Sequence, residues 1–226
     1  MNKLNIAVDG PAGAGKSTVA RLVAKALGYV HIDTGSMYRA VTWKMLQEEI
    51  APEQSDKIAE LAGRMRIELL PGEHGQRVLV DGRDVTDEIR SLAVNRLVGK
   101  VAQIPEVRRL LVQKQRQMAA AKGVVLDGRD IGTEVLPDAE VKIFLTASVK
   151  ERAERRYHEL ARVGQTIPLE QLEKEIAERD RMDEQREISP LVQAPDAVLI
   201  DSTDKTIEQV VDEVLTLCRS RSGGGT

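Results

Sequence analysis

The chain has 226 residues, and its 33 basic and 36 acidic side chains leave a formal charge of −3. Apolar residues make up 42% of the chain, which is too much for a disordered protein, and aromatic residues make up only 2%. The charge balance argues against a protein that binds nucleic acid with its whole surface. The scarcity of aromatic rings argues against one that stacks single-stranded bases.

Cys218 is the only cysteine, which excludes an intramolecular disulfide and a thiol-rich metal site. No apolar run of about 18 residues is present to cross a membrane. The N-terminal segment turns polar at Asp9, before a signal peptide would complete its apolar stretch. We therefore expect a cytoplasmic monomer that binds neither membranes nor nucleic acids.

The N-terminal part of the chain alternates predicted strands and helices. An apolar run at residues 4–8 predicts a buried strand, and apolar residues at helical spacing up to Leu27 predict a helix that stops at Gly28. A second strand is predicted at 30–32 and a second helix at about 36–49.

The stretch at about 66–85 interrupts this alternation. Short apolar runs on either side of the turn at 71–75 predict two strands, with a third near 83–85, and together they indicate a small inserted subdomain. Pro105 opens a predicted helix that continues to about residue 122.

The alternation then resumes to the end of the chain. Strands are predicted at 124–126, 141–145 and 197–200, and helices at about 148–163, after Pro168 and at 207–217. Five apolar strands separated by helices predict an α/β fold with a five-stranded parallel sheet and helices on both of its faces. Residues 222–226 are predicted to be a disordered tail.

A glycine-rich loop follows the first strand and matches G-x-x-x-x-G-K-[ST] at every fixed position. Its glycines let backbone N–H groups surround a phosphate chain, and the following helix adds the positive end of its dipole. Lys16 supplies a charge for the outer phosphates, and the Ser17 hydroxyl can bind Mg²⁺. The predicted nucleotide-binding residues are Gly10, Pro11, Ala12, Gly13, Ala14, Gly15, Lys16, Ser17 and Thr18.

The loop alone does not distinguish a GTPase, an ATPase motor and a small-molecule kinase. The Asn-Lys-x-Asp sequence expected of a GTPase is absent, and the composition does not suggest the surfaces of a motor. A kinase must hold its acceptor in line with the γ-phosphate, so a second anion site is expected.

Arginines at the ends of strands predict this second site. Arg39 follows the second strand and Arg129 follows the strand at 124–126. Ligands of doubly wound sheets collect at the carboxyl ends of the strands, so we expect both arginines and the glycine loop to meet in one cleft.

Further basic groups lie in the predicted helices. Arg108 belongs to the helix after Pro105, and Arg152, Arg155 and Arg156 belong to the helix at 148–163. The spacing of Arg179, Asp183 and Arg186 would place all three on one face of a helix.

Two carboxylates follow predicted strands beside this region. Asp9 and Asp127 are interpreted either as groups that organise Mg²⁺ and its waters or as caps of loops at strand ends. An acceptor that is itself a phosphate monoester would need no general base, because with a second pKa near 6 it is already largely anionic at neutral pH.

Several dispersed motifs together resemble the bacterial cytidylate kinase family. They are the glycine loop, Asp33-Thr34-Gly35, Asp127-Gly128-Arg129-Asp130, Glu178-Arg179-Asp180, Ser189-Pro190-Leu191 and Asp201-Ser202-Thr203. The resemblance covers nearly the whole chain, and the stretch at 66–85 resembles the enlarged monophosphate-binding domain of these enzymes. It implies transfer of the γ-phosphate of ATP, with Mg²⁺, to CMP or dCMP.

The resemblance also implies roles for individual residues. Thr34, Arg108 and Asp130 would bind the edge of the cytosine, and Asp183 the sugar hydroxyls. Arg152 and Arg156 would reach the ATP phosphates. The acceptor phosphate would be held by Arg39, Arg129, Arg179 and Arg186. Lys16, Arg129, Arg152, Arg156, Arg179 and Arg186 are thus the predicted catalytic residues, and Ser17, Asp9 and Asp127 the predicted metal site.

The implied organisation has three parts. The core domain covers 1–35, 106–150 and 166–221, the monophosphate-binding domain covers 36–105, and a short lid covers 151–165. Gly99 departs from the family, since a hydroxyl residue associated with sugar contact aligns there, and this bears on the ranking of CMP against dCMP. Thr34 stands where some relatives have Ser and keeps the hydroxyl.

Two other interpretations are kept as alternatives. One is a different P-loop kinase of the uridylate or shikimate type. The other is an ATP-dependent switch that transfers no phosphate.

Overall fold

The computed structural model describes residues 3–72, 75–162 and 164–222. The sequence predictions for Val163 and for 223–226 lie outside the described residues. By packing, the chain forms two compact units, Met1–Tyr29 with Lys122–Thr226, and Val30–Ala121. The division into core, monophosphate-binding domain and lid is a functional one and stays a prediction.

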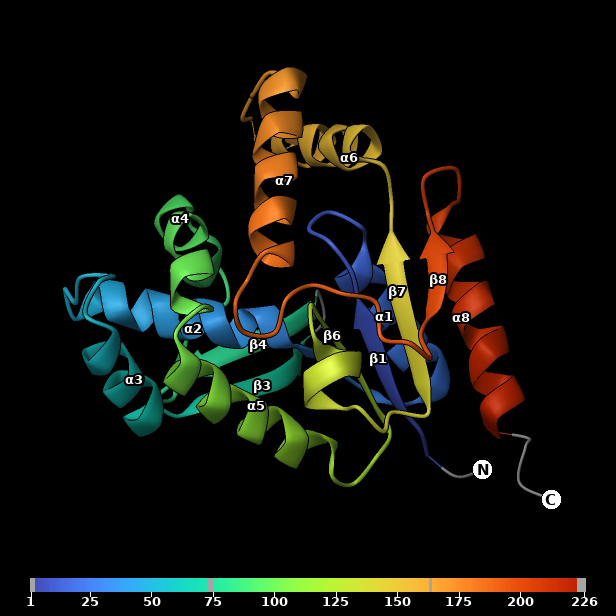
Figure 1. The fold of residues 1–226 in the computed structure, drawn as a ribbon, viewed down its shortest axis with the longest axis horizontal. Helices are drawn as coiled ribbons and strands as arrows, with labels where there is room; N and C mark the ends of the chain where they lie inside the picture. The colour runs from blue at the N-terminus through green and yellow to red at the C-terminus, as the bar shows by residue number, and fades with distance from the viewer. Residues whose placement is uncertain (1–2, 73–74, 163, 223–226) are drawn as a thin grey trace. The chain divides into compact units, whose positions relative to one another are not determined.

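The five-stranded sheet has the order β2-β6-β1-β7-β8, with β2 at Val30–Asp33. Figure 1 labels its strands β6, β1, β7 and β8. Strand β1 (Asn5–Asp9) pairs in parallel with β6 (Val124–Gly128) and with β7 (Val141–Thr146), and β8 (Val198–Asp201) pairs in parallel with β7. Apart from its half-buried first residue, β1 is fully buried, as its near-continuous apolar sequence requires. The predicted α/β class with a five-stranded parallel sheet is confirmed.

Helices α1 (Lys16–Leu27) and α8 (Ile207–Ser222) pack against each other and against the sheet of the first unit. Val19 and Val23 of α1 and Val210 and Val214 of α8 join the strand residues in one buried cluster. Gly28 ends α1 in the left-handed conformation, with φ at 66°, as the sequence predicts. Ser222 was predicted to start the tail. Instead, α8 continues five residues beyond the predicted end at Leu217, and Ser222 is its last residue.

Strand β7 leads into α6 (Val149–Arg162), and α7 (Leu169–Glu184) follows it. The two helices pack on each other through a small cluster of their own, formed by Ala153, Leu160, Leu172 and Ile176. Between β6 and β7 the chain makes a single π-helical turn, η2 (Ile131–Val135), which packs against β1.

The second unit opens with β2 (Val30–Asp33) and contains an antiparallel sheet of three strands, which confirms the predicted β-rich stretch. Trp43 is buried in its core, as expected. Helices α3 and α4 were not predicted. The unit's other elements are α2 (Thr34–Gln47), α3 (Ser55–Arg64), β3 (Ile67–Gly72), β4 (Gly75–Val80), β5 (Arg83–Asp84), η1 (Glu88–Arg90), α4 (Leu92–Val101) and α5 (Pro105–Ala119).

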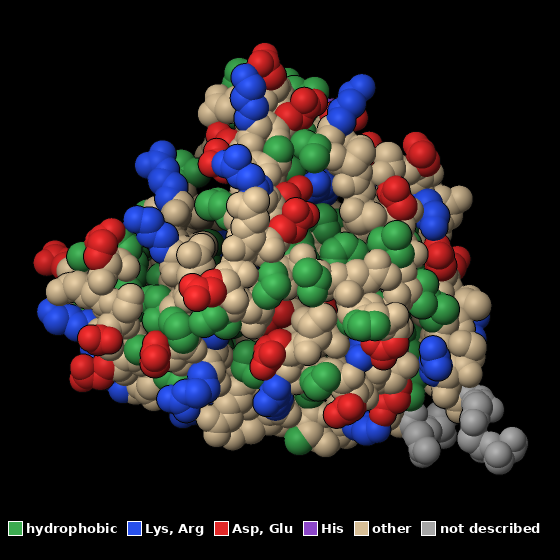
Figure 2. Space-filling view, viewed as in Figure 1, with side chains coloured by type: hydrophobic (Ala, Val, Ile, Leu, Met, Phe, Trp, Pro, Cys, Tyr) green, Lys and Arg blue, Asp and Glu red, His purple; other side chains and the backbone are tan. Residues whose placement is uncertain are grey.

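Basic and acidic side chains are intermixed over the face shown in Figure 2, without a broad field of one sign. This distribution agrees with the net charge of −3. Within the described ranges, no helix combines the length and apolar character needed to cross a membrane.

Candidate active site

The glycine loop joins the carboxyl end of β1 to the first residue of α1. Gly10 has a φ of 146°, and a Cβ atom there would lie 1.9 Å from the carbonyl oxygen of Leu145. Gly15, at the N-cap of α1, has a φ of 90°. Both positions therefore require glycine, and they place the loop against β7 and at the positive end of the helix.

Lys16 is buried at the start of α1, with only 7% of its surface exposed. Its Nζ donates a hydrogen bond of 2.7 Å to the carbonyl oxygen of Pro11 within the loop. Burial, followed by the nearby guanidinium of Arg129, holds the pKa of Lys16 well below its ordinary value. The ammonium group and the nearby guanidinium of Arg129 place positive charge where an anion could bind.

Ser17 and Asp127 meet beside the loop. The Ser17 hydroxyl donates a hydrogen bond of 2.6 Å to Oδ2 of Asp127, which is buried at the end of β6. A hydroxyl and a carboxylate are hard oxygen donors, so this pair fits the chemistry of Mg²⁺. No cluster of three or more His, Cys, Asp or Glu suited to a metal occurs among the described residues, so phosphate or water oxygens would have to complete the coordination.

Asp9 uses both oxygens to hold the backbone of η2. It accepts hydrogen bonds of 2.8 Å from the N–H of Ile131 and 2.7 Å from the N–H of Gly132. Burial raises the pKa of Asp9 to about 6, although these two hydrogen bonds act in the opposite direction. Of the two interpretations of Asp9, these contacts agree with the loop cap.

Asp183 collects two of the predicted arginines. Arg129 donates from Nε to its Oδ2 at 2.8 Å, and Arg186 donates to its Oδ1. Burial alone would raise the pKa of Asp183, but the guanidinium groups of Arg129 and Arg186 hold it below its ordinary value. Burial and the neighbouring Arg129 lower the pKa of Arg179, so this end of the sheet concentrates positive charge.

The helical spacing proposed for Arg179, Asp183 and Arg186 is wrong in one respect. Helix α7 ends at Glu184, so Arg186 lies beyond it and does not share a helix face with the other two. Its side chain nevertheless pairs with Asp183, three residues earlier, and the N–H of Leu191 donates to the Asp183 carbonyl.

The two arginines predicted to act from a lid, Arg152 and Arg156, differ in their surroundings. Arg152 is 4% exposed and forms a bidentate ion pair with Asp180 of α7, with N–O distances of 2.9 and 2.6 Å. The Arg156 side chain is 46% exposed and pairs with the exposed Glu159 one turn further along α6.

Three predicted substrate residues belong to the second unit. Thr34 is buried as the first residue of α2, whose N-cap is Asp33. Arg39 donates hydrogen bonds to Asn95 and to the carbonyl of Ile89. Arg108 lies 5.5 Å from the centre of the Tyr38 ring and donates to the carbonyl of Ala102.

Some residues of the site received no role from the sequence. Asp180 pairs with Arg152, and Arg155 donates to both the carbonyl and the hydroxyl of Ser202. Asn95 accepts a hydrogen bond from Arg39, 56 residues earlier in the chain, and no local sequence pattern predicts that contact. Asp180 belongs to the motif Glu178-Arg179-Asp180, and its place beside Arg179 was the one feature of the sequence that indicated a role.

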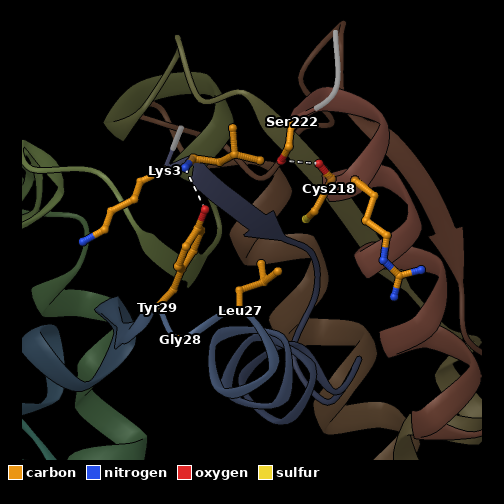
Figure 3. Close-up of a pocket in the computed structure, with 8 residues that line it drawn as sticks. Lys3, Leu27, Gly28, Tyr29, Cys218 and Ser222 are labelled. Atoms are coloured by element: carbon orange, nitrogen blue, oxygen red, sulfur yellow. Dashed lines mark hydrogen bonds between the residues drawn. The ribbon is translucent and has the colours of Figure 1, made fainter. Parts of the chain in front are cut away.

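A cavity of about 260 Å³ lies at the opposite end of β1 from the glycine loop (Figure 3). Its walls come from the start of β1, the end of α1 and the end of α8, and include Leu4, Leu27, Tyr29 and Cys218. The Tyr29 hydroxyl accepts a hydrogen bond from the N–H of Leu4, and burial raises the pKa of Cys218 to about 11. A thiol with this pKa is inert at neutral pH.

A parallel α/β sheet with a glycine loop at its carboxyl end, a buried lysine and clustered arginines defines a phosphate-binding protein of the P-loop kinase class. The family model described as cytidylate kinase matches residues 6–220. The chain therefore belongs to the cytidylate kinase family.

Individual relatives agree with this assignment. The chain is 52% identical over 221 residues to the cytidylate kinase of Caldanaerobacter subterraneus subsp. tengcongensis, covering 98% of this chain and 97% of that protein. It is 50% identical over 220 residues to the cytidylate kinase of Bacillus subtilis, covering 97% and 98%. A crystal structure of an uncharacterised protein from Eubacterium ventriosum has a TM-score of 0.54 at 13% identity, covering 96% and 99%, and supports the fold alone.

Proposed function

We propose that this protein transfers the γ-phosphate of ATP to CMP or dCMP and releases ADP with CDP or dCDP. Membership of the cytidylate kinase family supports this activity. The observation that carries the geometry is the buried Lys16 in the glycine loop, near Arg129 and Arg179 of the same unit. Two phosphate-bearing ligands would add negative charge beside Lys16 and these arginines.

We assign the donor phosphates to the glycine loop. Residues 10–18 would direct N–H groups at the phosphate chain, and Lys16 would exchange its bond to the Pro11 carbonyl for a phosphate oxygen. Ser17 and Asp127 would hold Mg²⁺ together with those oxygens, and Asp9 would fix the neighbouring backbone. When bound, the ion would neutralise charge on the phosphates.

We assign the acceptor phosphate to Arg129, Arg179 and Arg186 of the first unit and to Arg39 of the second. An oxygen of this phosphate would attack the γ-phosphorus as the bond to the bridging oxygen of ADP breaks. The attacking oxygen carries no proton that must be removed, so neither Asp127 nor Asp130 needs to act as a base. Asp183 would bind the sugar hydroxyls in place of part of its present pairing with arginine.

Selection of cytosine would rest on hydrogen bonds. Cytosine has an amino group that donates and a ring nitrogen that accepts, so Asp130 would accept from the former and Arg108 would donate to the latter, with Thr34 beside them. Uracil would put a carbonyl against the carboxylate and leave buried polar groups unpaired. The rate with UMP as acceptor would therefore be lower than with CMP, by at most several powers of ten. Arg152 and Arg156 are proposed to act from the lid, whose closure would exclude water from the transfer.

The test is ADP release in a coupled assay with CMP, dCMP, UMP, AMP and shikimate as separate acceptors. We expect release to depend on CMP or dCMP and to be much slower with the others. Equal rates with AMP and CMP would contradict the proposal. Release that ignores every acceptor would favour the ATP-dependent switch, and preference for UMP or shikimate would favour the other kinases.

A further inference from the structure

Arg152 is a charged side chain with several hydrogen bonds beside the glycine loop. It projects from the first turn of α6 and is buried. Its Nε donates to the carbonyl of Ala147 at 2.9 Å and its Nη1 to the carbonyl of Ala12, in the loop itself, at 2.9 Å. Asp180 takes one hydrogen bond from each terminal nitrogen. These contacts engage four of the five N–H groups of a guanidinium.

The Asp180 carboxylate fixes this arrangement from a different helix. Its side chain is 14% exposed and belongs to the last turns of α7. The fork-to-fork geometry adds two bonds to those with Ala147 and Ala12 and so helps to fix the orientation of the guanidinium plane. Because the same plane carries the bond to Ala12, Asp180 contributes to how Arg152 meets the loop.

The loop is packed closely against Arg152. A Cβ atom on Gly13 would lie 3.3 Å from the Cβ of Arg152, which is tighter than an ordinary contact. The bond to Ala12 and this packing hold the outer part of the loop from the side of α6. The loop backbone that would surround the donor phosphates is thereby connected to α7 through the Arg152 side chain.

Asp180 also belongs to the segment of α7 that carries acceptor residues. It follows Arg179 directly and precedes Asp183, which pairs with Arg129, by less than one helical turn. A shift of α7 that breaks the Arg152 pair must therefore move Arg179 and Asp183 as well.

We propose that Asp180 is a positioning residue that joins the donor loop to the acceptor segment of α7 through Arg152. This rests on the proposed roles of Arg179 and Asp183 in acceptor binding. Its role is to keep the acceptor phosphate in line with the γ-phosphate and to transmit the binding of one nucleotide to the site of the other. We assign Asp180 itself no contact with either substrate.

The test compares Asp180→Asn with Glu178→Gln. Glu178 lies on the same helix and pairs with Arg181, but both side chains are 63% exposed, so its variant is a matched control. We expect Asp180→Asn to lower kcat/KM for CMP by about 10²-fold, because small misplacements of reacting groups have effects of this size. The Kd for a non-hydrolysable ATP analogue should change less than about threefold, and Glu178→Gln should match the wild type.

Two further readouts separate positioning from a general loss of structure. In the wild type we expect the ATP analogue to tighten CMP binding. In Asp180→Asn the ratio of the Kd for CMP without the analogue to the Kd with it should fall towards one. Adding Arg152→Lys to Asp180→Asn should cause little further loss, since both act through one pair. If Asp180→Asn does not fold, Asp180→Glu, which keeps the charge but lengthens the side chain, replaces it with melting temperature as the check.

The outcomes are distinguishable. A folded Asp180 variant with wild-type kcat/KM and wild-type coupling overturns this inference while the activity stands. An equal loss in Glu178→Gln also overturns it. If the wild type itself releases no ADP in response to CMP, the proposed function fails instead.

Discussion

The two ends of the parallel sheet in the first unit differ in what they bury. The carboxyl end buries Asp9, Lys16, Asp127, Arg152 and Asp183, most of them in hydrogen bonds between separate elements. The amino end has a mostly apolar cavity whose buried titratable group is the inert Cys218. The amino end also buries Lys142, but this charge is paired with Asp196 and the Pro137 carbonyl. Burying charge is costly, so the concentration of buried charged groups at the carboxyl end marks that end as functional.

The difference between the two ends of the sheet is tested most directly by a substitution of Lys16. We expect Lys16→Met to lower kcat by about 10³-fold, since it removes a charge aimed at the outer phosphates from a buried site. Removal of a buried, desolvated ammonium should not lower the melting temperature much, which separates this effect from unfolding. Steady-state kinetics with a thermal melt provides the measurement, and a loss below about tenfold would remove Lys16 from the mechanism.

The buried carboxylate of Asp9, at the carboxyl end of the sheet, should make the free energy of unfolding depend on pH. Its folded-state pKa of about 6 is above its ordinary value, so the protonated form stabilises the fold at low pH. This contribution is lost as pH rises from about 4 to 6, by up to ~3 kcal/mol.

We therefore expect the free energy of unfolding of the wild type, relative to Asp9→Asn, to decrease over this range. Urea unfolding of both proteins at several pH values, without nucleotide or Mg²⁺, measures the difference. A difference that rises with pH would show that the hydrogen bonds from Ile131 and Gly132 outweigh burial.

The same substitution at a glycine of each end should have unequal effects. Gly10→Ala sets a Cβ against the Leu145 carbonyl, whereas at Gly28 nothing lies within 4 Å of such an atom and only the left-handed φ opposes it. We expect Gly28→Ala to lower the free energy of unfolding by about 1 kcal/mol and Gly10→Ala by about 2 kcal/mol more. Denaturant unfolding checks this, and equal losses would mean that the loop relaxes around the added methyl.

The smallest effect is expected at Cys218. Cys218→Ala should leave kcat within about twofold and lower the free energy of unfolding by about 1 kcal/mol. In the folded wild type, the high pKa and burial should keep the thiol from reacting with a thiol reagent at pH 8 until denaturant is added. Rapid labelling of native protein would show that the amino end is open.

The sequence predicted the parts that depend on neighbouring residues. The glycine loop could be located because its glycines, lysine and serine are contiguous, and the strands because their apolar runs are short and bounded. Helices α3 and α4 were not predicted, because the strand pattern that lies between them was the stronger signal in this region.

Contacts made across the fold could not be predicted in this way. Nothing near Arg152 indicates that Asp180, 28 residues later, would take its guanidinium. The place of Arg186 failed for a related reason, since helical spacing was extended past Glu184, where α7 ends. Beyond the helix end the backbone no longer follows helical spacing, although Arg186 still pairs with Asp183, three residues earlier.

The central claim is that the arginines at the carboxyl end of the sheet hold an acceptor phosphate. It is tested most directly by kcat/KM for CMP in Arg129→Ala beside Arg181→Ala, whose arginine is exposed on α7. We predict a loss of about 10²-fold or more for Arg129→Ala and no loss for Arg181→Ala. A value for Arg129→Ala within about threefold of the wild type would contradict the claim.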